Sequence, residues 1–307
     1  MEPVFSIVIP THNRAELVRR TVQAFLAQEG PAFEVIVVDD GSTDATPQVL
    51  QAIGDTRVQV VRQPNQGLAA ARNAGFALAQ GRYVLFNDDD VIPEPHFLLA
   101  HRRMHQQFDR CAAVSRTHIP DALGQRPFVR FWRERAEGGV RGKPNAAPLG
   151  RGGFWFASLS LPRAELPPQP FAAFKGYGWE EHELGLRLWR RGIRPRLAAE
   201  ARAAHEDRVS LEATAAKVRS MGRMAWEFLR QHPGWDVALW TGANPLAMAY
   251  QRLAYPWPRA ERLLRDLSWE SGPGAFRNYR FVLSAAYVRG LLEGRAALSD
   301  TITTTGG

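Results

Sequence analysis

Acidic and other polar side chains follow three short apolar runs in the first hundred residues. They form the clusters Thr11-His12-Asn13, Asp39-Asp40 and Asp88-Asp89-Asp90. Three adjacent carboxylates repel one another unless a cation offsets their charge, and oxygen ligands favour hard divalent ions. The triplet therefore indicates a site for Mg²⁺ or Mn²⁺, with a solvent-exposed acidic turn as the alternative. Asp39-Asp40 indicates an acceptor for a ribose hydroxyl or a base N–H, with a turn and a helix cap as the alternative.

The apolar runs that precede these clusters alternate with segments of helical spacing. Such alternation is typical of a parallel sheet with right-handed crossovers, in which ligands bind at the carboxyl ends of the strands. The three polar clusters are therefore expected at one edge of the sheet. The predicted strands are 5–9, 34–38, 58–61 and 82–86, and the predicted helices are 14–28, 46–53 and 68–79.

The rest of the chain is predicted to change from mixed to helical structure. Residues 121–151, with scattered Gly and Pro, are predicted to form a long loop over the site, and the segment from 211 to about 298 is predicted to be helical. Further helices are predicted at 94–107 and 183–191, and further strands at 111–115, 154–161 and 195–197. We expect a catalytic domain over 1–205, a helical region packed on it over 206–299 and a flexible tail over 300–307.

Composition excludes several classes of protein. The 307 residues are 45% hydrophobic and 23% charged, which is unlike a disordered chain, a collagen or a coiled coil. A single cysteine, Cys111, excludes an internal disulfide and a Cys-cluster zinc site. The sequence shows no signal peptide and no apolar run long enough to span a bilayer. We expect a cytoplasmic protein, with peripheral contact to the inner membrane face as the alternative.

The chain is basic, with 39 Lys and Arg against 31 Asp and Glu and a net charge of +8. Such a charge favours anionic partners. Five tryptophans and several arginines lie in the C-terminal hundred residues, which indicates a helical subdomain, with a membrane-surface segment as the alternative. His101 and His105 have helical i,i+4 spacing but lack the Glu of a zinc protease between them. They are predicted on a solvated helix face.

Five stretches of the sequence resemble the motifs of family 2 glycosyltransferases, and four of them lie in the first ninety residues. The resemblance covers residues 4 to about 205. It implies the α/β GT-A fold, a Rossmann-like, mostly parallel sheet flanked by helices, here with a C-terminal helical extension. The stretches are FSIVIPTHNR at 5–14, VIVVDDGSTD at 35–44, NQGLAAARNAG at 65–75, YVLFNDDD at 83–90 and GYGWEEHELGLRL at 176–188.

The resemblance also implies a nucleotide-sugar donor and a nucleotide site. On the matching positions, Pro10, Thr11 and Asn13 line the nucleotide pocket, Asp40 contacts the base, and Arg72 lies near the nucleotide or its phosphates. Asp88 and Asp90 hold the ribose and the metal bound to the diphosphate, and Asp89 is the alternative ligand. The triplet departs from the family's commoner Asp-Ala-Asp. His205 is an implied metal ligand, with a structural histidine as the alternative.

The fifth motif implies the catalytic base. A metal ion offsets the charge on the departing diphosphate, so an inverting displacement needs only one base to deprotonate the acceptor hydroxyl. Glu181 occupies the base position, where the family normally has Asp, and Glu180 is the alternative. Both carboxylates could instead cap the following helix. Trp179 adjoins the base and is predicted to face the acceptor, with core packing as the alternative.

Together these patterns predict an inverting glycosyltransferase that depends on Mn²⁺ or Mg²⁺. It is expected to move a sugar from a nucleotide-diphosphate sugar, with UDP-sugars favoured, to a saccharide or lipid-linked acceptor in cell-surface polysaccharide or glycoconjugate synthesis. A sugar-phosphate nucleotidyltransferase is one alternative, although residues 11–14 lack its Gly-rich phosphate loop. A basic nucleic-acid-binding protein is another, because Phe128, Phe131 and Trp132 are interleaved with arginines. The acidic strand ends argue against it, so we expect no nucleic-acid partner.

Overall fold

The computed structural model describes residues 2–123, 126–174, 176–206 and 209–305. These residues form two compact units. The first unit comprises residues 1–123, 135–173 and 181–207, and the second comprises 124–134, 174–180 and 208–307.

The first unit is built on an eight-stranded sheet with the order β3-β2-β1-β4-β7-β6-β8-β5. Strands β1 to β4 pair in parallel, and β6 pairs in parallel with β8, whereas β7 and β5 run antiparallel to their neighbours. The predicted mostly parallel sheet is therefore confirmed. The strands are β1 (Phe5–Thr11), β2 (Phe33–Asp40), β3 (Val58–Gln63), β4 (Tyr83–Asn87), β5 (Val91–Pro93), β6 (Cys111–His118), β7 (Ser158–Pro162) and β8 (Arg194–His205).

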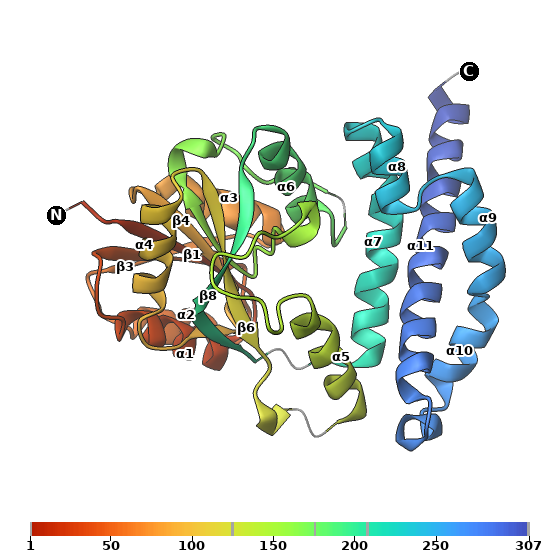
Figure 1. Ribbon diagram of the computed structural model, residues 1–307, viewed down its shortest axis with the longest axis horizontal. Helices are drawn as coiled ribbons and strands as arrows, with labels where there is room; N and C mark the ends of the chain where they lie inside the picture. Colours follow the sequence, from red (N-terminus) through yellow and green to blue (C-terminus); the bar gives the residue numbers. More distant parts are fainter. Residues whose placement is uncertain (1, 124–125, 175, 207–208, 306–307) are drawn as a thin grey trace. The chain divides into compact units, whose positions relative to one another are not determined.

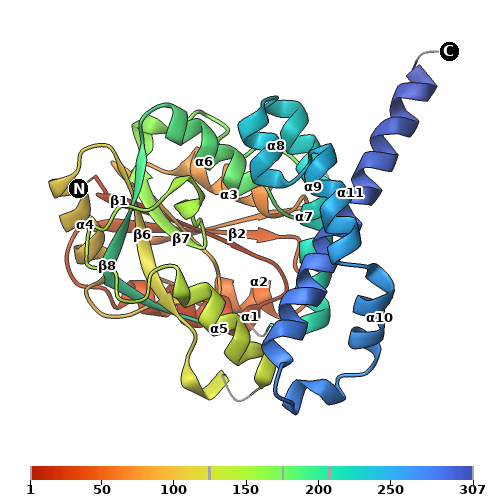
Figure 2. The ribbon, with the colours of Figure 1, turned by 45° about the vertical axis from the view of Figure 1, so that its right-hand side comes forward.

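Helices cover both faces of this sheet, as Figure 2 shows. Apolar side chains of β1, β2 and β4 point alternately to the two faces, because successive residues of a strand face opposite ways. One apolar layer packs against α3 and α6, and the other packs against α1, α2 and α4. The helices are α1 (Ala15–Leu26), α2 (Thr46–Gln51), α3 (Leu68–Leu78), α4 (Phe97–Gln107) and α6 (Glu180–Arg190).

The second unit contains helices α7 to α11, and in Figure 1 α7 and α11 run side by side. Glycines allow this close approach: a Cβ atom on Gly222 would lie 2.2 Å from the Tyr287 carbonyl oxygen, and one on Gly290 would lie 2.0 Å from that of Arg219. In the described part of the chain, no helix combines the length and apolarity that crossing a bilayer requires. The helices are α7 (Leu211–Gln231), α8 (Trp235–Thr241), α9 (Pro245–Ala254), α10 (Trp257–Arg265) and α11 (Ala275–Thr305).

Two local predictions are wrong. Residues 121–151 are not a continuous loop, since α5 (Pro127–Gly138) forms within them. His101 and His105 are buried on the sheet side of α4. His101 forms hydrogen bonds with the hydroxyls of Ser160 and Ser115, and His105 forms one with the hydroxyl of Ser160. Helix α11 continues to Thr305, into the segment 300–307, and the flexibility expected for that segment stays a prediction. The last two residues of that segment lie outside the described residues.

The aromatic residues of α5 pack inside the second unit. Phe128 and Phe131 are buried, with ring centroids 5.1 and 5.2 Å from that of Tyr279. These two rings therefore have no free face on which a base could stack, and the observation that suggested a nucleic-acid-binding protein is explained by packing.

Candidate active site

The polar ends of β1, β2 and β4 meet at one edge of the sheet, as predicted. Thr11 and Asp39 are register partners on β1 and β2, and the Thr11 hydroxyl donates to Asp89 Oδ2 at 2.7 Å. Pro10 lies one residue earlier on β1, buried and paired with Val38. The chain order of a parallel sheet brings these residues together although up to 79 positions separate them, from Pro10 to Asp89.

Asn13 holds the loop that follows β2. Its backbone has a φ of +53°, a left-handed conformation that Asn tolerates. Its side-chain oxygen accepts from the Thr43 N–H at 2.7 Å, and its own N–H donates to Ser42 Oγ at 2.9 Å. Asn13 therefore positions the Gly41–Asp44 turn. Gly41 is required in that turn, since its φ is +76° and a Cβ atom there would lie 2.7 Å from the Asn65 nitrogen.

The two adjacent aspartates of β2 have different environments. Both oxygens of Asp40 accept hydrogen bonds from the loop that leads into α3: Oδ1 from Gln66 N–H at 2.9 Å and Oδ2 from Gly67 N–H at 2.8 Å. Asp39 Oδ1 accepts from Ser42 N–H, whereas its buried Oδ2 makes no hydrogen bond with the described residues and forms an ion pair with Arg62, whose Nε atom lies 3.4 Å away. Asp40 thus shapes the loop, and Asp39 Oδ2 can accept from a ligand N–H beside its ion pair with Arg62.

Each aspartate of the triplet contacts an arginine. The Arg14 Nη1 atom donates to Asp89 Oδ1 at 3.0 Å and to Asp90 Oδ2 at 2.5 Å. The Arg72 Nη2 atom donates to Asp88 Oδ1 at 2.7 Å. The sequence suggested that a bound cation offsets the repulsion between the three carboxylates. In the structure, the positive charges of Arg14 and Arg72 offset it.

The environments of the three carboxylates shift their pKa values in different directions. Burial raises the pKa of Asp89 to about 7, although Arg14 opposes this. Burial would also raise the pKa of Asp90, but the close approach of His205 together with Arg14 lowers it to about 2. Burial raises the pKa of Asp88 as well, against the charge of Arg72. Asp90 is consequently the carboxylate that stays ionised over the widest pH range.

Arg72 joins the aspartate triplet to the predicted base. Its side chain is fully buried, stacks over the Phe171 ring at 5.3 Å, and comes from α3. The Nη1 atom donates to Glu181 Oε1 at 2.6 Å, while Nη2 donates to Asp88. One planar guanidinium therefore fixes the direction of both carboxylates.

Glu181 and Glu180 begin α6 and differ in exposure. The Glu181 side chain is 26% exposed, so one of its oxygens can reach a ligand while the other is held by Arg72. Glu180 is 6% exposed and belongs to the second unit. The structure thus brings Glu181 to the aspartate triplet, and it places Glu180 in a buried setting.

Trp179 does not form the acceptor platform that the sequence suggested. It is 5% exposed, its indole N–H donates to the Met221 carbonyl oxygen at 2.7 Å, and its ring stacks on Phe228 with centroids 4.9 Å apart. A ring covered in this way supplies packing within the second unit and has little surface left for a sugar.

Asp90 and His205 are suited to a divalent cation. Asp90 Oδ1 is buried, makes no hydrogen bond with the described residues and lies 3.4 Å from His205 Nε2. His205 reaches this position because β8 continues well past the predicted strand at 195–197. Among the described residues, no group of three or more His, Cys, Asp or Glu side chains could hold a metal ion alone. A bound cation would therefore need donors from a ligand, as Mg²⁺ usually takes from phosphates.

Arg14 is a site residue that the sequence left without a role, and Asp39 was predicted as a ligand acceptor only together with Asp40. Both stood in the quoted motifs, next to residues that were assigned. A signal for Arg14 existed, because it is the one cation immediately beyond the first polar cluster. Which of two adjacent aspartates faces a ligand, in contrast, depends on a one-residue alternation along β2 that composition does not reveal.

Comparison with known proteins gives a family match and several relatives. Residues 6–159, half of the chain, match the family model described as glycosyl transferase family 2. Succinoglycan biosynthesis protein ExoO of Rhizobium meliloti (strain 1021) is 40% identical over 112 residues, which cover 36% of this chain and 31% of that protein. Validoxylamine A glucosyltransferase of Streptomyces hygroscopicus subsp. jinggangensis (strain 5008) is 30% identical over 271 residues, which cover 75% of this chain and 61% of that protein.

The chain is also similar to a third relative and to a solved structure. A putative teichuronic acid biosynthesis glycosyltransferase, TuaG of Bacillus subtilis (strain 168), is 42% identical over 92 residues, covering 29% of this chain and 36% of that protein. The chain thus spans less than two thirds of each of these relatives. A Pyrobaculum calidifontis mannosyltransferase solved with GDP-Man and Mn2+ superposes with a TM-score of 0.59 at 18% identity, covering 96% of this chain and 87% of the other. That likeness shows a shared fold.

Proposed function

Since the chain belongs to glycosyl transferase family 2 and has the GT-A fold, we propose that it transfers a sugar from a nucleotide-diphosphate sugar to an acceptor hydroxyl, with inversion at the anomeric carbon. The observation that supports this most directly is the Arg72 bridge, which holds Glu181 and the Asp88 end of the triplet in one arrangement. An inverting displacement requires a base and a diphosphate site within the length of one sugar, and this pair supplies both.

Glu181 is the base in this proposal. Arg72 holds its Oε1 atom, which leaves Oε2 to accept the proton of the acceptor hydroxyl as that oxygen attacks the anomeric carbon. The glycosidic bond to the diphosphate breaks in the same step, and the bonding electrons leave with the nucleoside diphosphate. Arg72 acts as a positioning residue, since it is fully buried and its ion pairs are with the carboxylates of Asp88 and Glu181.

Asp90 and His205 would hold a divalent cation, with Asp88 and Asp89 on the nucleotide side. When bound, such a cation supplies positive charge that stabilises the departing diphosphate. Thr11 and Arg14 keep the Asp89 carboxylate in place, and Asp39, Asn13 and Pro10 form the adjoining nucleotide edge of β1 and β2. UDP-sugars remain the proposed donor class.

The relatives support a saccharide acceptor. ExoO and TuaG are named for succinoglycan and teichuronic acid biosynthesis, so cell-surface polysaccharide or glycoconjugate synthesis is the proposed setting, with a lipid-linked saccharide as the alternative acceptor. The family match and the missing phosphate loop favour this function over a sugar-phosphate nucleotidyltransferase.

A thermal-shift screen tests the donor and the metal together. The protein is heated with UDP, GDP or dTDP, each with and without Mn²⁺, because a ligand that binds the folded state raises the melting temperature. We expect the largest shift from UDP with Mn²⁺, and we expect Asp90→Asn to lose the metal-dependent part. Asp55→Asn, on the surface beside Arg57, is the matched control and should retain it. Shifts that do not depend on Mn²⁺ in the unmodified protein would contradict the metal role.

A further inference from the structure

Large apolar side chains are exposed together on α8 and α9 of the second unit. Trp235 and Leu239 are 77% and 69% exposed and lie one turn apart on α8. Leu246, Tyr250 and Leu253 are 85%, 69% and 84% exposed and have the i, i+4, i+7 spacing of a single helix face on α9. We refer to these five residues as the α8–α9 apolar surface. Scattered exposed apolar residues are ordinary, but five on two consecutive helices indicate an interaction site.

A cavity of about 370 Å³ adjoins this surface. It lies between the end of α7 and the start of α9, and Leu229, Pro233, Trp235, Ala238 and Pro245 are among its lining residues. Trp235 belongs to both, so the cavity and the α8–α9 apolar surface meet at this side chain. The cavity is an open depression, mostly apolar, with Asn244 as the polar side chain of its lining, and it can cover part of a hydrocarbon group.

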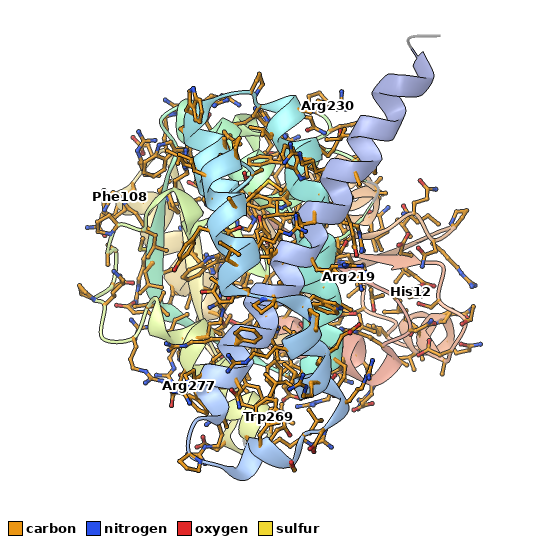
Figure 3. All side chains as sticks on the ribbon, turned by 90° about the vertical axis from the view of Figure 1, so that its right-hand side faces the viewer. His12, Phe108, Arg219, Arg230, Trp269 and Arg277 are labelled. Atoms are coloured by element: carbon orange, nitrogen blue, oxygen red, sulfur yellow. The ribbon has the colours of Figure 1, made fainter. Side chains whose placement is uncertain are left out.

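Helix α10, which follows directly, exposes positive charge. Arg259, Arg262 and Arg265 are exposed and lie within two turns, while Ala260 on the opposite side of the helix is buried. Their single acidic neighbour on α10 is Glu261, 4.0 Å from Arg265. Arg252 adds a fourth exposed cation on α9. Figure 3 shows α9 and α10 at the front of the second unit.

We propose that the α8–α9 apolar surface and the α10 arginines dock on a lipid bilayer that carries anionic headgroups. Trp, Tyr and Leu side chains enter the boundary between headgroups and acyl chains, and the arginines contact the headgroups. The cavity beside Trp235 receives part of an acyl chain. Charge complementarity favours this occupant over a second copy of the chain, because an interface between copies would add a second set of arginines to the first.

Co-sedimentation with lipid vesicles tests the proposal. The full-length protein is mixed with vesicles of phosphatidylcholine alone or of equimolar phosphatidylcholine and phosphatidylglycerol. We expect at least tenfold tighter binding to the phosphatidylglycerol vesicles, with partial loss in high salt because salt screens the arginine contacts. Leu246→Ser combined with Leu253→Ser should weaken binding at least tenfold. Both side chains are more than 80% exposed, so the melting temperature should stay unchanged.

Matched variants distinguish binding through these particular side chains from nonspecific effects of substitution. Arg262→Gln with Arg265→Gln should reduce binding to anionic vesicles, whereas Arg102→Gln with Arg103→Gln, an exposed pair on α4, should leave it unchanged. Val60→Ser, at an exposed apolar position on β3, is the apolar control. Equal binding of all variants, or no binding by the unmodified protein, would overturn the proposal. A dimer in light scattering that Leu246→Ser with Leu253→Ser converts to a monomer would overturn it in favour of contact between copies. This test does not involve sugar transfer, so its outcome is independent of the proposed function.

Discussion

At the scale of single residues, the positive charges of Arg72 and Arg14 balance the carboxylates of the candidate active site. Arg72 is buried with two carboxylate partners, and Arg14 spans two more. Removing one member of a buried charge pair leaves the other uncompensated and costs about 3–5 kcal/mol. The two arginines are therefore as important to the geometry of the site as its acids are.

Glu181→Gln should abolish most of the transfer while leaving nucleotide binding intact. The amide keeps the shape of the side chain but cannot accept the proton, and loss of a general base typically reduces rates by about 10²–10⁴-fold. The measurement is the transfer rate beside the thermal shift with UDP and Mn²⁺. Glu180→Gln is the matched control and should remain active. If Glu180→Gln were inactive and Glu181→Gln active, Glu180 would be the base.

The buried pair His101 and His105 should make stability depend on pH. Burial lowers the pKa of each imidazole from 6.5 to about 3. Between these values the unfolded chain binds protons that the folded chain does not, so the free energy of unfolding falls as the pH falls from 7 toward 4. The slope is at most roughly 1.4 kcal/mol per pH unit for each histidine.

Melting temperatures measured from pH 7 to pH 4 test this expectation. His105→Gln should flatten the curve, because glutamine does not titrate and can still bond to Ser160. His118→Gln, at a partly exposed position on β6, serves as the comparison and should retain the original slope. A melting temperature independent of pH over this range would show that the two imidazoles are not held neutral by burial.

Among the elements, α7 and α11 show most clearly how sequence controls packing. Gly290 and Gly294 are one turn apart on α11 and face the carbonyl oxygens of Arg219 and Arg223 on α7. Arg219 and Arg223 also pair with Glu293, which adds polar contacts beside the glycine contact. These helices therefore meet at backbone distance, where no larger side chain fits.

Gly290→Ala should destabilise the second unit strongly. The added methyl group would lie 2.0 Å from the Arg219 oxygen, so one helix has to move, and such overpacking costs about 3 kcal/mol. Chemical denaturation followed by tryptophan fluorescence measures this. Gly138→Ala is the control, since a Cβ atom there has no neighbour within 4 Å. An unchanged denaturation midpoint for Gly290→Ala would contradict the close packing of α7 and α11.

For the molecule as a whole, the net charge influences which ligands are attracted, and the length of α11 influences the packing of the second unit. The net charge of +8 favours anionic ligands in general, while the proposed nucleotide site and the proposed bilayer surface lie in two different units. Helix α11 contributes to the second unit through residues up to Leu291 and Gly294. The chain beyond about residue 298 follows this packed part.

Deleting residues 299–307 should leave transfer activity within about twofold and the denaturation midpoint nearly unchanged, since the last few residues of a domain usually contribute little to its stability. The comparison is a deletion from residue 285 onward, which removes Gly290 and Gly294 and should unfold the second unit. Activity and circular dichroism are measured for both. Loss of activity on removing 299–307 would show that this end takes part in the site or in its support.

Elements that depend on residues close together in the sequence could be predicted, whereas features that depend on contacts between distant residues could not. Strands β1, β2 and β4 were predicted to within a few residues, because their apolar runs are short, continuous and bounded by polar clusters. Helix α5 was missed because Gly and Pro around it resemble loop punctuation, and its apolar face is defined by packing on Tyr279 more than 140 positions away. His101 and His105 were misplaced because i,i+4 spacing identifies a helix face but not its surroundings.

By itself, the sequence determined the alternation of strands and helices, the polar strand ends and the motifs of a glycosyltransferase, since these depend on neighbouring residues and regular periods. Only the tertiary structure decided that Arg72 bridges Asp88 and Glu181, that Asp40 shapes a loop while Asp39 pairs with Arg62, and that Trp179 is buried. The physical reason is that hydrogen bonding and burial depend on residues that are distant along the chain, and local patterns carry no record of which distant residues meet.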